Sequence, residues 1–400
     1  MSRSAAVPLA LGSGIAALLG VAVAAALPVG SPLRFDHVDG GSLGALFLCA
    51  AATAFALYVI ALVFLRRRSM RIGLVCAIAV VIQLLPLAGP LILSRDVYAY
   101  WAYGRVISAH GGNPYAIPPV HYPTDPAQRA MSPVWRPDTT VYGPVFSWSS
   151  ALLAKITGPT PEVSAFTYRI VAASGVLVAV LLAALIASRA AFAAAFVGWN
   201  PLLALPSAGG GHNDIWMAVL MLGALLLAKH GRHRLSGACW VVAGGLKWVA
   251  LAFVPLQLTA AARVARGRTI VGLLIAGSGI ATAAFVAFGT SWLAAVQPFV
   301  HRRSAYAVQS RLAQLGLGHT AARAVVLGLL GLTVVFLVRN ARAGRPRLGL
   351  GAVAILLATP WILPWYTAWA VPLAAVEEDL TTWVLVLALS GYLLPDRVPI

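Results

Sequence analysis

Apolar residues run along this chain in long blocks that are separated by short polar stretches. A membrane span takes about 20 mostly apolar residues. Blocks of roughly this length lie at about 5 to 27, 41 to 65, 72 to 94, 165 to 187, 190 to 206, 212 to 228, 236 to 262, 269 to 289, 321 to 338, 348 to 375 and 380 to 395. The pattern therefore predicts an all-α polytopic membrane protein with about 10 to 12 transmembrane helices.

Charge supports the same interpretation. The chain has 29 Lys and Arg against 11 Asp and Glu. The basic residues gather between apolar blocks, at 66 to 71, 229 to 234, 263 to 268 and 339 to 347. By the positive-inside rule these clusters face the cytoplasm. A basic face with interleaved aromatic residues is missing, so nucleic acid is not expected as a partner.

Two blocks do not fit one straight helix each. The block at 236 to 262 has arginine-rich ends on both sides, which predicts a hairpin of two short helices that turns near Gly244, Gly245 and Lys247. Broken helices persist in a membrane only where they are buried in protein or line a wet cavity. Within 348 to 375, the prolines at 360 and 364 favour a turn at the outer face over one long helix.

The longest region without an apolar block, about 95 to 164, is rich in Tyr, Trp and Pro. Alternation of the helices places it outside the cytoplasm. Aromatic residues with a polar tip favour the membrane interface. A long ordered loop in a compact protein usually carries function, so we expect interfacial helices here and not a linker.

The few acidic residues gather on the outer side. Seven of the 11 fall there by this topology: Asp36, Asp39, Asp96, Asp125, Asp138, Glu162 and Asp214. Asp96 stands out because it follows the third apolar block directly. On a helix, Asp96, Tyr100 and Tyr103 share one face. Trp101 and Gly104 share the neighbouring face, which is free to lie on lipid.

Two interpretations of Asp96 are open. Its carboxylate pairs with Arg95 or Arg105 in an interfacial helix, or it is a general base held at the depth where a lipid headgroup arrives.

Four short motifs follow in order along the chain. They are Gly112-Asn113-Pro114-Tyr115, Tyr142-Gly143-Pro144, Gly211-His212-Asn213-Asp214 and Pro364-Trp365-Tyr366. With Asp96 before them, this order resembles the C-superfamily of glycosyltransferases, which use polyprenyl-phosphate sugars. It is most similar to the polyprenol-phosphomannose-dependent α-mannosyltransferases of bacterial envelope lipoglycan synthesis.

The resemblance implies a glycosyltransferase core at 72 to 376, after two leading helices in 1 to 71 and before a C-terminal helix in 377 to 400. In that family the catalytic base is an aspartate of the core's first outer loop, and Asp96 matches it. The two leading helices put Asp36 and Asp39 in the literal first outer loop, so both remain rivals for the catalytic role.

The residues agree with a lipid-linked donor. The chain has no Gly-rich phosphate loop after a strand and no Asp-x-Asp, so neither a nucleotide-sugar domain nor a metal or cofactor site is expected. A departing phosphate needs cations, and Lys247 is a candidate because a lysine inside an apolar run costs a few kcal/mol unless it is paired or wet. The substrate-binding candidates are Tyr100, Tyr103, Asn113, Tyr115, Tyr142, His212, Asn213, Asp214, Lys247, Arg302, Arg303, Trp365 and Tyr366.

The sequence thus predicts an inverting enzyme in the plasma membrane. It would move a hexose, mannose by the resemblance, from a polyprenyl phosphate to a glycan or glycolipid acceptor on the outer face. A multi-pass transporter or lipid flippase is the alternative, although such proteins tend to show inverted repeats and ionisable groups near the bilayer midplane. A non-catalytic envelope assembly factor is a third possibility.

Overall fold

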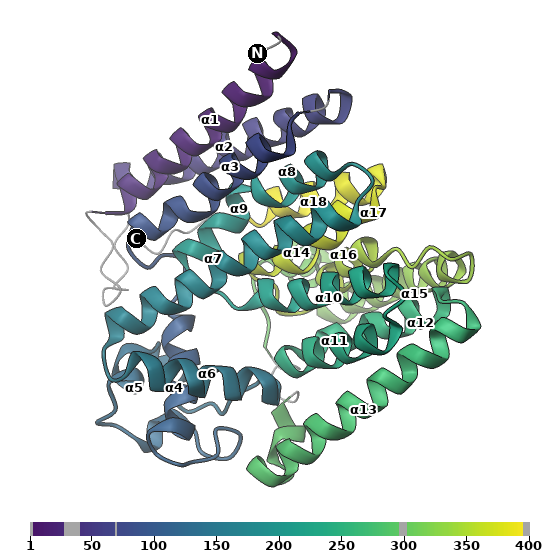
Figure 1. Cartoon of the computed structure of the whole chain (residues 1–400). Helices are drawn as coiled ribbons and strands as arrows, with labels where there is room; N and C mark the ends of the chain where they lie inside the picture. The colour runs from purple at the N-terminus through teal and green to yellow at the C-terminus, as the bar shows by residue number, and fades with distance from the viewer. Residues whose placement is uncertain (1–2, 28–40, 69, 296–301, 395–400) are drawn as a thin grey trace.

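The computed structural model describes residues 3–27, 41–68, 70–295 and 302–394 (Figure 1). Within these ranges all regular structure is helical. Five helices are long and apolar enough to cross a membrane. They are α1 (Arg3–Ala26), α2 (Gly41–Arg67), α7 (Pro161–Ile186), α13 (Arg263–Phe288) and α15 (His319–Arg342). The predicted all-α polytopic membrane protein is confirmed.

The other apolar blocks form shorter or broken helices. α8 (Ala190–Gly198) and α9 (Pro201–Ala204), with the turn that continues to Gly209, form a sixth candidate span that bends by 52°. The bend falls where Pro201 follows Asn200, whose side chain accepts from Leu202 N at 2.9 Å. The remaining apolar helices are α3 (Ile72–Leu84), α10 (Asp214–Lys229), α11 (His233–Leu246), α12 (Val254–Ala260), α16 (Leu348–Ala358), α17 (Val371–Glu377) and α18 (Leu380–Tyr392).

Both predicted breaks are present. α11 ends at Leu246, Lys247 is extended, and a 3₁₀ segment (Trp248–Phe253) leads into α12. A Cβ added to Gly244 would lie 2.6 Å from Leu251 Cδ2, so the segment after the break folds back against α11. Farther on, α16 ends at Ala358 and a second 3₁₀ turn, Pro364–Trp369, precedes α17.

Figure 1 shows how these helices are arranged. α1, α2 and α3 lie together at the N-terminal end, and α3 packs against α8. The long α7 runs from this group to α4 (Asp96–Ser108), α5 (Pro126–Ala130) and α6 (Pro144–Thr157). α10, α11 and α13 lie beside one another, with the short α14 (Val308–Leu312) farther along the chain. The predicted division of the chain into two leading helices (1 to 71), a core (72 to 376) and a C-terminal helix (377 to 400) stays a prediction.

The segment from 95 to 164 is ordered and well braced. The Asp125 carboxylate accepts from Arg105 Nε at 2.9 Å, from Ala127 N at 2.8 Å and from His110 Nε2 at 2.7 Å. His110 in turn stacks on Tyr122, with ring centroids 3.9 Å apart. These contacts join α4 to the start of α5 and to Tyr122, which follows the 3₁₀ turn Pro119–His121. A second 3₁₀ turn, Pro133–Trp135, follows α5.

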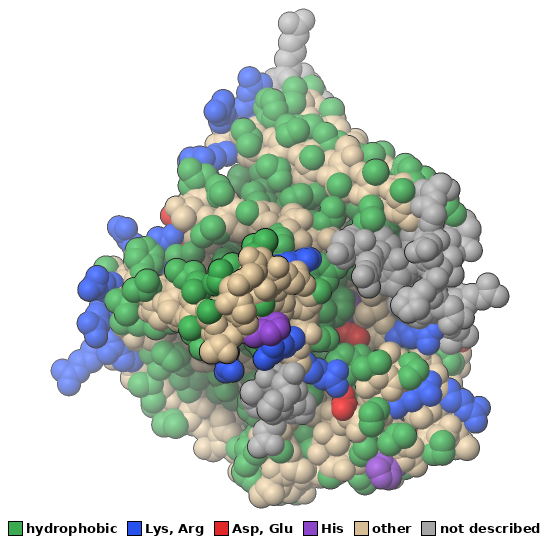
Figure 2. Space-filling model, turned by 180° about the vertical axis from the view of Figure 1, so that it is seen from behind, with side chains coloured by type: hydrophobic (Ala, Val, Ile, Leu, Met, Phe, Trp, Pro, Cys, Tyr) green, Lys and Arg blue, Asp and Glu red, His purple; other side chains and the backbone are tan. Residues whose placement is uncertain are grey.

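Charge on the surface is uneven. Figure 2 shows Lys and Arg side chains along the left edge of that view and again near its centre and at its lower right, with hydrophobic side chains between these groups. Apolar side chains of α13 and α15 contribute to the exposed surface, including Ile275, Val286 and Leu332, which are 69%, 85% and 71% exposed. Such exposure suits helices whose surroundings are lipid.

Candidate active site

Asp96 is the first residue of α4. Ser94 Oγ accepts a hydrogen bond from Asp96 N at 3.1 Å, which satisfies one of the free N–H groups at the start of the helix. The Asp96 side chain is 19% exposed. It lines a small cavity of about 50 Å³, which we call the acidic cavity. A carboxylate there can meet a substrate.

The face of α4 that was predicted to carry chemistry faces a cavity, because Tyr100 and Tyr103 line the acidic cavity with Asp96. The prediction that the neighbouring face lies on lipid was wrong. Trp101 is fully buried. A Cβ on Gly104 would lie 2.2 Å from Ser150 O, so the lack of a side chain there lets α6 pack directly on α4.

His212 joins three parts of the site. Its ring stacks on Trp365 with centroids 3.8 Å apart. Its Nε2 lies 3.3 Å from Ser94 Oγ, and its Nδ1 lies 3.4 Å from the Tyr100 hydroxyl. Burial, together with the nearby Lys247 ammonium, holds the pKa of His212 well below its usual value. The imidazole is therefore neutral at pH 7.

The pKa of Asp96 is raised from its usual 3.8 to about 6. Burial is the main cause, and the nearby carboxylate of Asp214 adds to it. The hydrogen bond from Ser94 and the charge of Lys247 act in the opposite direction. A carboxylate with a pKa near the working pH is suited to accept a proton in a reaction.

Lys247 lies at the break after α11 and forms an ion pair with Asp214, the first residue of α10. The Asp214 side chain is 1% exposed and also accepts from Trp369 Nε1 at 2.5 Å. This pairing explains how both charges are tolerated inside the protein. Because α11 ends at Leu246 and Lys247 is extended, the Lys247 side chain reaches Asp214 at the start of α10.

Aromatic rings surround the Lys247 ammonium. It lies 5.0 Å from the ring centroid of Tyr366, 5.2 Å from that of Trp369 and 5.7 Å from that of Tyr142. Cations are attracted to such ring faces. Tyr142 is brought here by Gly143, where a Cβ would lie 2.2 Å from Gly245 O.

Arg302, which precedes α14, also lines the acidic cavity. It forms an ion pair with Asp138 and lies 4.1 Å from the ring centroid of Trp135. Arg303 is exposed and lines a different cavity. Both predicted arginines therefore line a cavity next to Lys247, and among the described residues only Arg302 of the two has a carboxylate partner.

Three cavities meet at Lys247, which lines each of them. The first is the acidic cavity. The second, of about 590 Å³, has apolar walls from α15 and α16 and includes Arg303 and Arg323; we call it the arginine cavity. The third, of about 370 Å³, lies among α6, α7, α10 and α11; we call it the α6–α11 cavity. The last two have the size of small-molecule sites.

The other predicted site residues have different places. Asn113 Nδ2 donates to Phe288 O and Ser291 Oγ, both at 2.9 Å. The Tyr115 hydroxyl donates to Tyr142 O at 3.0 Å. Asn113 ties the segment 95–164 to the end of α13, whereas the Tyr115 hydrogen bond lies within that segment. Neither residue is among the described residues that line these three cavities. Asn213 lines the α6–α11 cavity.

Asp36 and Asp39 lie outside the described residues. Arg105, one suggested partner of Asp96, instead binds Asp125. In the part of the chain that the structure describes, no group of three or more His, Cys, Asp or Glu side chains is arranged to hold a metal ion.

Several residues that line or build the site were not predicted from the sequence. Arg323 and Trp361 line the arginine cavity, and Trp369 binds Asp214. Arg169, inside α7, donates to Ala208 O at 2.7 Å and to Pro86 O at 2.5 Å, and so joins the turns before Asp96 and His212. An arginine inside an apolar run is the same signal that marked Lys247. No sequence pattern marked Trp361 or Trp369 as site residues.

Comparisons with known proteins point in one direction. The family model for "Alpha-(1->6)-mannopyranosyltransferase, N-terminal domain" matches residues 7–263, which is more than half of the chain. Alpha-(1->6)-mannopyranosyltransferase A of Mycobacterium tuberculosis is 27% identical over 342 residues, which is 74% of this chain and 66% of the relative.

Two corynebacterial proteins are similar as well. Alpha-(1->6)-mannopyranosyltransferase B of Corynebacterium glutamicum is 27% identical over 358 residues, covering 76% of this chain and 59% of the relative. Alpha-(1->6)-mannopyranosyltransferase A of the same organism is 30% identical over 167 residues, covering 41% of this chain and 34% of the relative. This chain therefore spans less than two thirds of the length of these relatives. No solved structure matches it.

Proposed function

We propose that this chain, which belongs to the alpha-(1->6)-mannopyranosyltransferase family, transfers a mannosyl group to a glycan or glycolipid acceptor. The donor would be a polyprenyl-phosphate mannose and the new bond an α-(1→6) linkage. The reaction would take place at the outer face of the plasma membrane. Asp96 would be the general base.

The observation that carries the proposal is the difference between Asp96 and the carboxylates near it. Asp214 is held by Lys247, and Asp138 by Arg302. Asp96 lies 3.8 Å from a neutral imidazole, and its pKa is raised to about 6. A base must be able to gain a proton, and a carboxylate in an ion pair with a cation gains one less readily.

The acidic cavity, of about 50 Å³, is smaller than a sugar ring, but the aromatic side chains around it suit contact with one. Tyr103, Trp135, Trp361, Trp365 and Tyr366 all line it. Aromatic rings offer flat apolar faces, and Tyr and Trp add a polar tip that can hydrogen-bond to hydroxyl groups. This combination fits a ring that is apolar on its faces and polar at its edge.

The arginine cavity suits the donor lipid. Val326, Leu327 and Ile355 give it an apolar wall, and Arg303 and Arg323 add two cations near Lys247. An isoprenoid chain would take the apolar wall, while its phosphate would bind to the cations. Because the arginine cavity and the acidic cavity share Tyr142, Lys247 and Tyr366, the phosphate and the sugar can occupy neighbouring sites.

The step itself follows from this arrangement. The acceptor hydroxyl gives its proton to Asp96 while its oxygen forms a bond to the anomeric carbon of mannose. The bond between that carbon and the phosphate oxygen breaks, and its electron pair leaves with the lipid phosphate, which is stabilised by the cations. One direct displacement inverts the anomeric centre, as in inverting glycosidases. A β-linked donor would therefore give an α-linked product.

Purified protein in liposomes, given radiolabelled polyprenyl-phosphate mannose and a short mannoside, tests the proposal. Labelled product that an α-(1→6)-specific mannosidase removes is the expected result. Movement of intact donor across the bilayer without any transfer to the mannoside would instead support the transporter or flippase alternative.

A further inference from the structure

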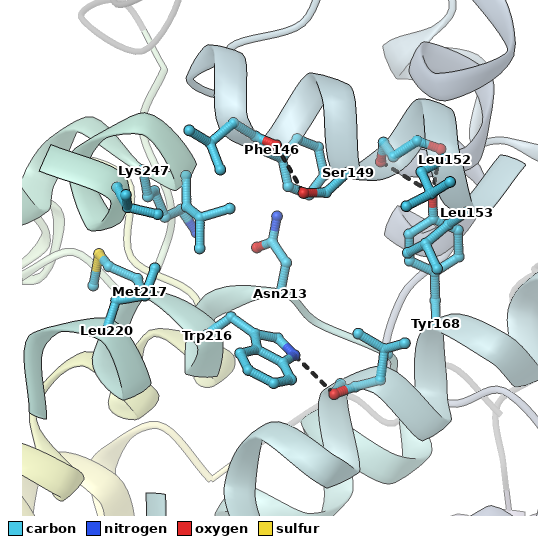
Figure 3. Close-up of a pocket in the computed structure, with 17 residues that line it drawn as sticks. Phe146, Ser149, Leu152, Leu153, Tyr168, Asn213, Trp216, Met217, Leu220 and Lys247 are labelled. Atoms are coloured by element: carbon cyan, nitrogen blue, oxygen red, sulfur yellow. Dashed lines mark hydrogen bonds between the residues drawn. The ribbon is translucent and has the colours of Figure 1, made fainter. Parts of the chain in front are cut away.

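The α6–α11 cavity has no part in the step described above. Its walls are almost entirely apolar, with Leu153, Met217, Leu220 and Val242 among the side chains that line it. Leu152, which also lines it, is 60% exposed, so the cavity reaches the outer surface of the helices. Figure 3 shows Leu152, Leu153, Met217 and Leu220 among the side chains around this cavity. Such a space fits a flexible hydrocarbon chain.

One polar side chain extends into this cavity. Figure 3 shows Asn213 directed into it, between Trp216 and the side chains of α6. Asn213 Oδ1 is buried and has no hydrogen-bond partner in the described part of the chain. Buried polar atoms normally have such a partner. Asn213 therefore suits a ligand that brings a hydroxyl or amide donor to the head of its hydrocarbon chain.

Charge separates this cavity from the arginine cavity. The arginine cavity includes Arg303 and Arg323 in addition to Lys247. The only cation among the described residues that line the α6–α11 cavity is Lys247, whose charge is already balanced by Asp214. An anionic lipid is therefore favoured in the arginine cavity, and a neutral chain with a hydroxylated head in the α6–α11 cavity.

A thin aromatic wall separates the α6–α11 cavity from the acidic cavity. Phe146 lines the α6–α11 cavity, and its ring lies 5.3 Å from that of Tyr100 and 4.2 Å from that of Tyr142, which both line the acidic cavity. Lys247 lines both spaces. A head group at Asn213 and Lys247 would thus be within a short reach of Asp96.

We infer that the α6–α11 cavity binds the hydrocarbon chain of the acceptor, and that the acceptor is a neutral glycolipid with only one or two sugars between its chain and the reacting hydroxyl. The inference rests on the proposed function and makes it more specific. Two lipid chains then flank Lys247, the donor's in the arginine cavity and the acceptor's in the α6–α11 cavity. A longer glycan would place its reacting end too far from the chain for both to be bound at once.

A series of mannosides tests this. Methyl, butyl and octyl α-mannoside and octyl α-tetramannoside would be compared in liposomes that hold the protein and labelled donor. The ratio of kcat/KM for octyl to methyl mannoside should be roughly tenfold or more, because each buried methylene adds to binding. The octyl tetramannoside should lose most of this advantage.

Paired variants separate binding in the cavity from simple partition of the alkyl chain into the membrane. Ser149 lines the cavity, and Ser174 is not among its lining residues. Each serine hydroxyl donates to a carbonyl of its own helix at 2.8 Å. Ser149→Phe fills the cavity and should bring the octyl-to-methyl ratio close to one, whereas Ser174→Phe should leave the ratio as it is in the unaltered protein.

The possible results separate the inference from the proposed function. An equal ratio in both variants, no dependence on chain length, or a preference for the tetramannoside would overturn the inference while transfer to methyl mannoside still supports the proposed function. Absence of transfer to every mannoside would overturn the proposed function itself, and the inference with it.

Discussion

Nδ1 of His212 lies 3.8 Å from Oδ2 of Asp96, and the imidazole is held there by its stack on Trp365. Because burial lowers the pKa of His212, the ring carries no charge that would neutralise the carboxylate. Lys247 and Arg302, which line the acidic cavity with Asp96, are paired with Asp214 and Asp138. The contact therefore fixes the position of Asp96 and leaves its carboxylate able to accept a proton.

The pH dependence of transfer follows from the raised pKa of Asp96. A base acts only when it is ionised, and the pKa of this carboxyl is about 6. We expect kcat/KM to rise about tenfold per pH unit below pH 6 and to level off above it. A profile measured from pH 4.5 to 8 checks this, with donor and acceptor stability tested separately. A flat profile down to pH 4.5 would mean that the base has an ordinary carboxylate pKa.

The ion pair between Lys247 and Asp214 predicts an asymmetric pair of variants. Lys247→Met leaves Asp214, which is 1% exposed, without its cation. Loss of one partner of a buried pair typically costs about 3 to 5 kcal/mol, so the thermal midpoint and the membrane abundance should fall. Adding Asp214→Asn removes the unpaired charge and should restore stability.

Activity should not follow stability in this pair. The double variant lacks the cation near the donor phosphate, so it should fold normally and transfer slowly. Thermal unfolding and transfer measured on the same preparations check this. A double variant as active as the unaltered protein would show that Lys247 contributes to packing alone.

Arg303 and Arg323 are predicted to act on the donor. Both are exposed and line the arginine cavity. Arg303→Gln or Arg323→Gln should raise the KM for donor by about three- to tenfold with a smaller change in kcat, since exposed charges are partly screened. Arg339→Gln, near the other end of α15, is the matched control and should leave this KM unchanged. An equal effect at Arg339 would indicate a general effect of surface charge.

Much of the fold could be predicted because a bilayer imposes a simple rule on the sequence. Long apolar blocks and the basic clusters between them indicated the helices, and the break at Lys247 followed from the charges that flank its block. Helix lengths were harder. Pro86 and Pro201 divide blocks that look continuous by composition, because proline shortens a helix without making the segment polar.

The candidate site was predictable where a polar residue stands in an apolar setting. Lys247 inside an apolar block and Asp96 directly after one met that condition, whereas Asp214 was named through its motif. The structure brings all three near one another. Asn113 and Tyr115 belong to turn motifs, and in the structure they bind other parts of the chain. A motif alone does not separate a residue that shapes a loop from one that faces a cavity. Packing between helices decides which residues face a cavity. At Gly104, for example, the close approach of α6 buries that face of α4.

The proposed orientation can be tested with reporter fusions. Fusions after Arg68, Arg234 or Arg342 should read cytoplasmic, because those positions end or follow basic clusters. Fusions near Asp125 or Arg303 should read external. An external reading at Arg68 would invert the topology and place Asp96 on the cytoplasmic side, where an acceptor on the outer face could not reach it.

The role of Asp96 as the base is the central claim, and Asp96→Asn tests it while keeping the size of the side chain. The variant should insert normally. Because the folded-state pKa of Asp96 lies above its usual value, ionisation costs folding stability as the pH rises from about 4 through 6. The asparagine avoids this cost, so the thermal midpoint at pH 7.5 should be unchanged or higher.

The most direct measurement is transfer by Asp96→Asn, Asp36→Asn and Asp39→Asn at matched membrane abundance. General-base catalysis is typically worth about 10² to 10⁴ in rate, so Asp96→Asn should lose that much activity. The other two variants should stay close to the unaltered protein. Full activity in Asp96→Asn, together with loss in Asp36→Asn or Asp39→Asn, would contradict the account and place the catalytic base in the first loop.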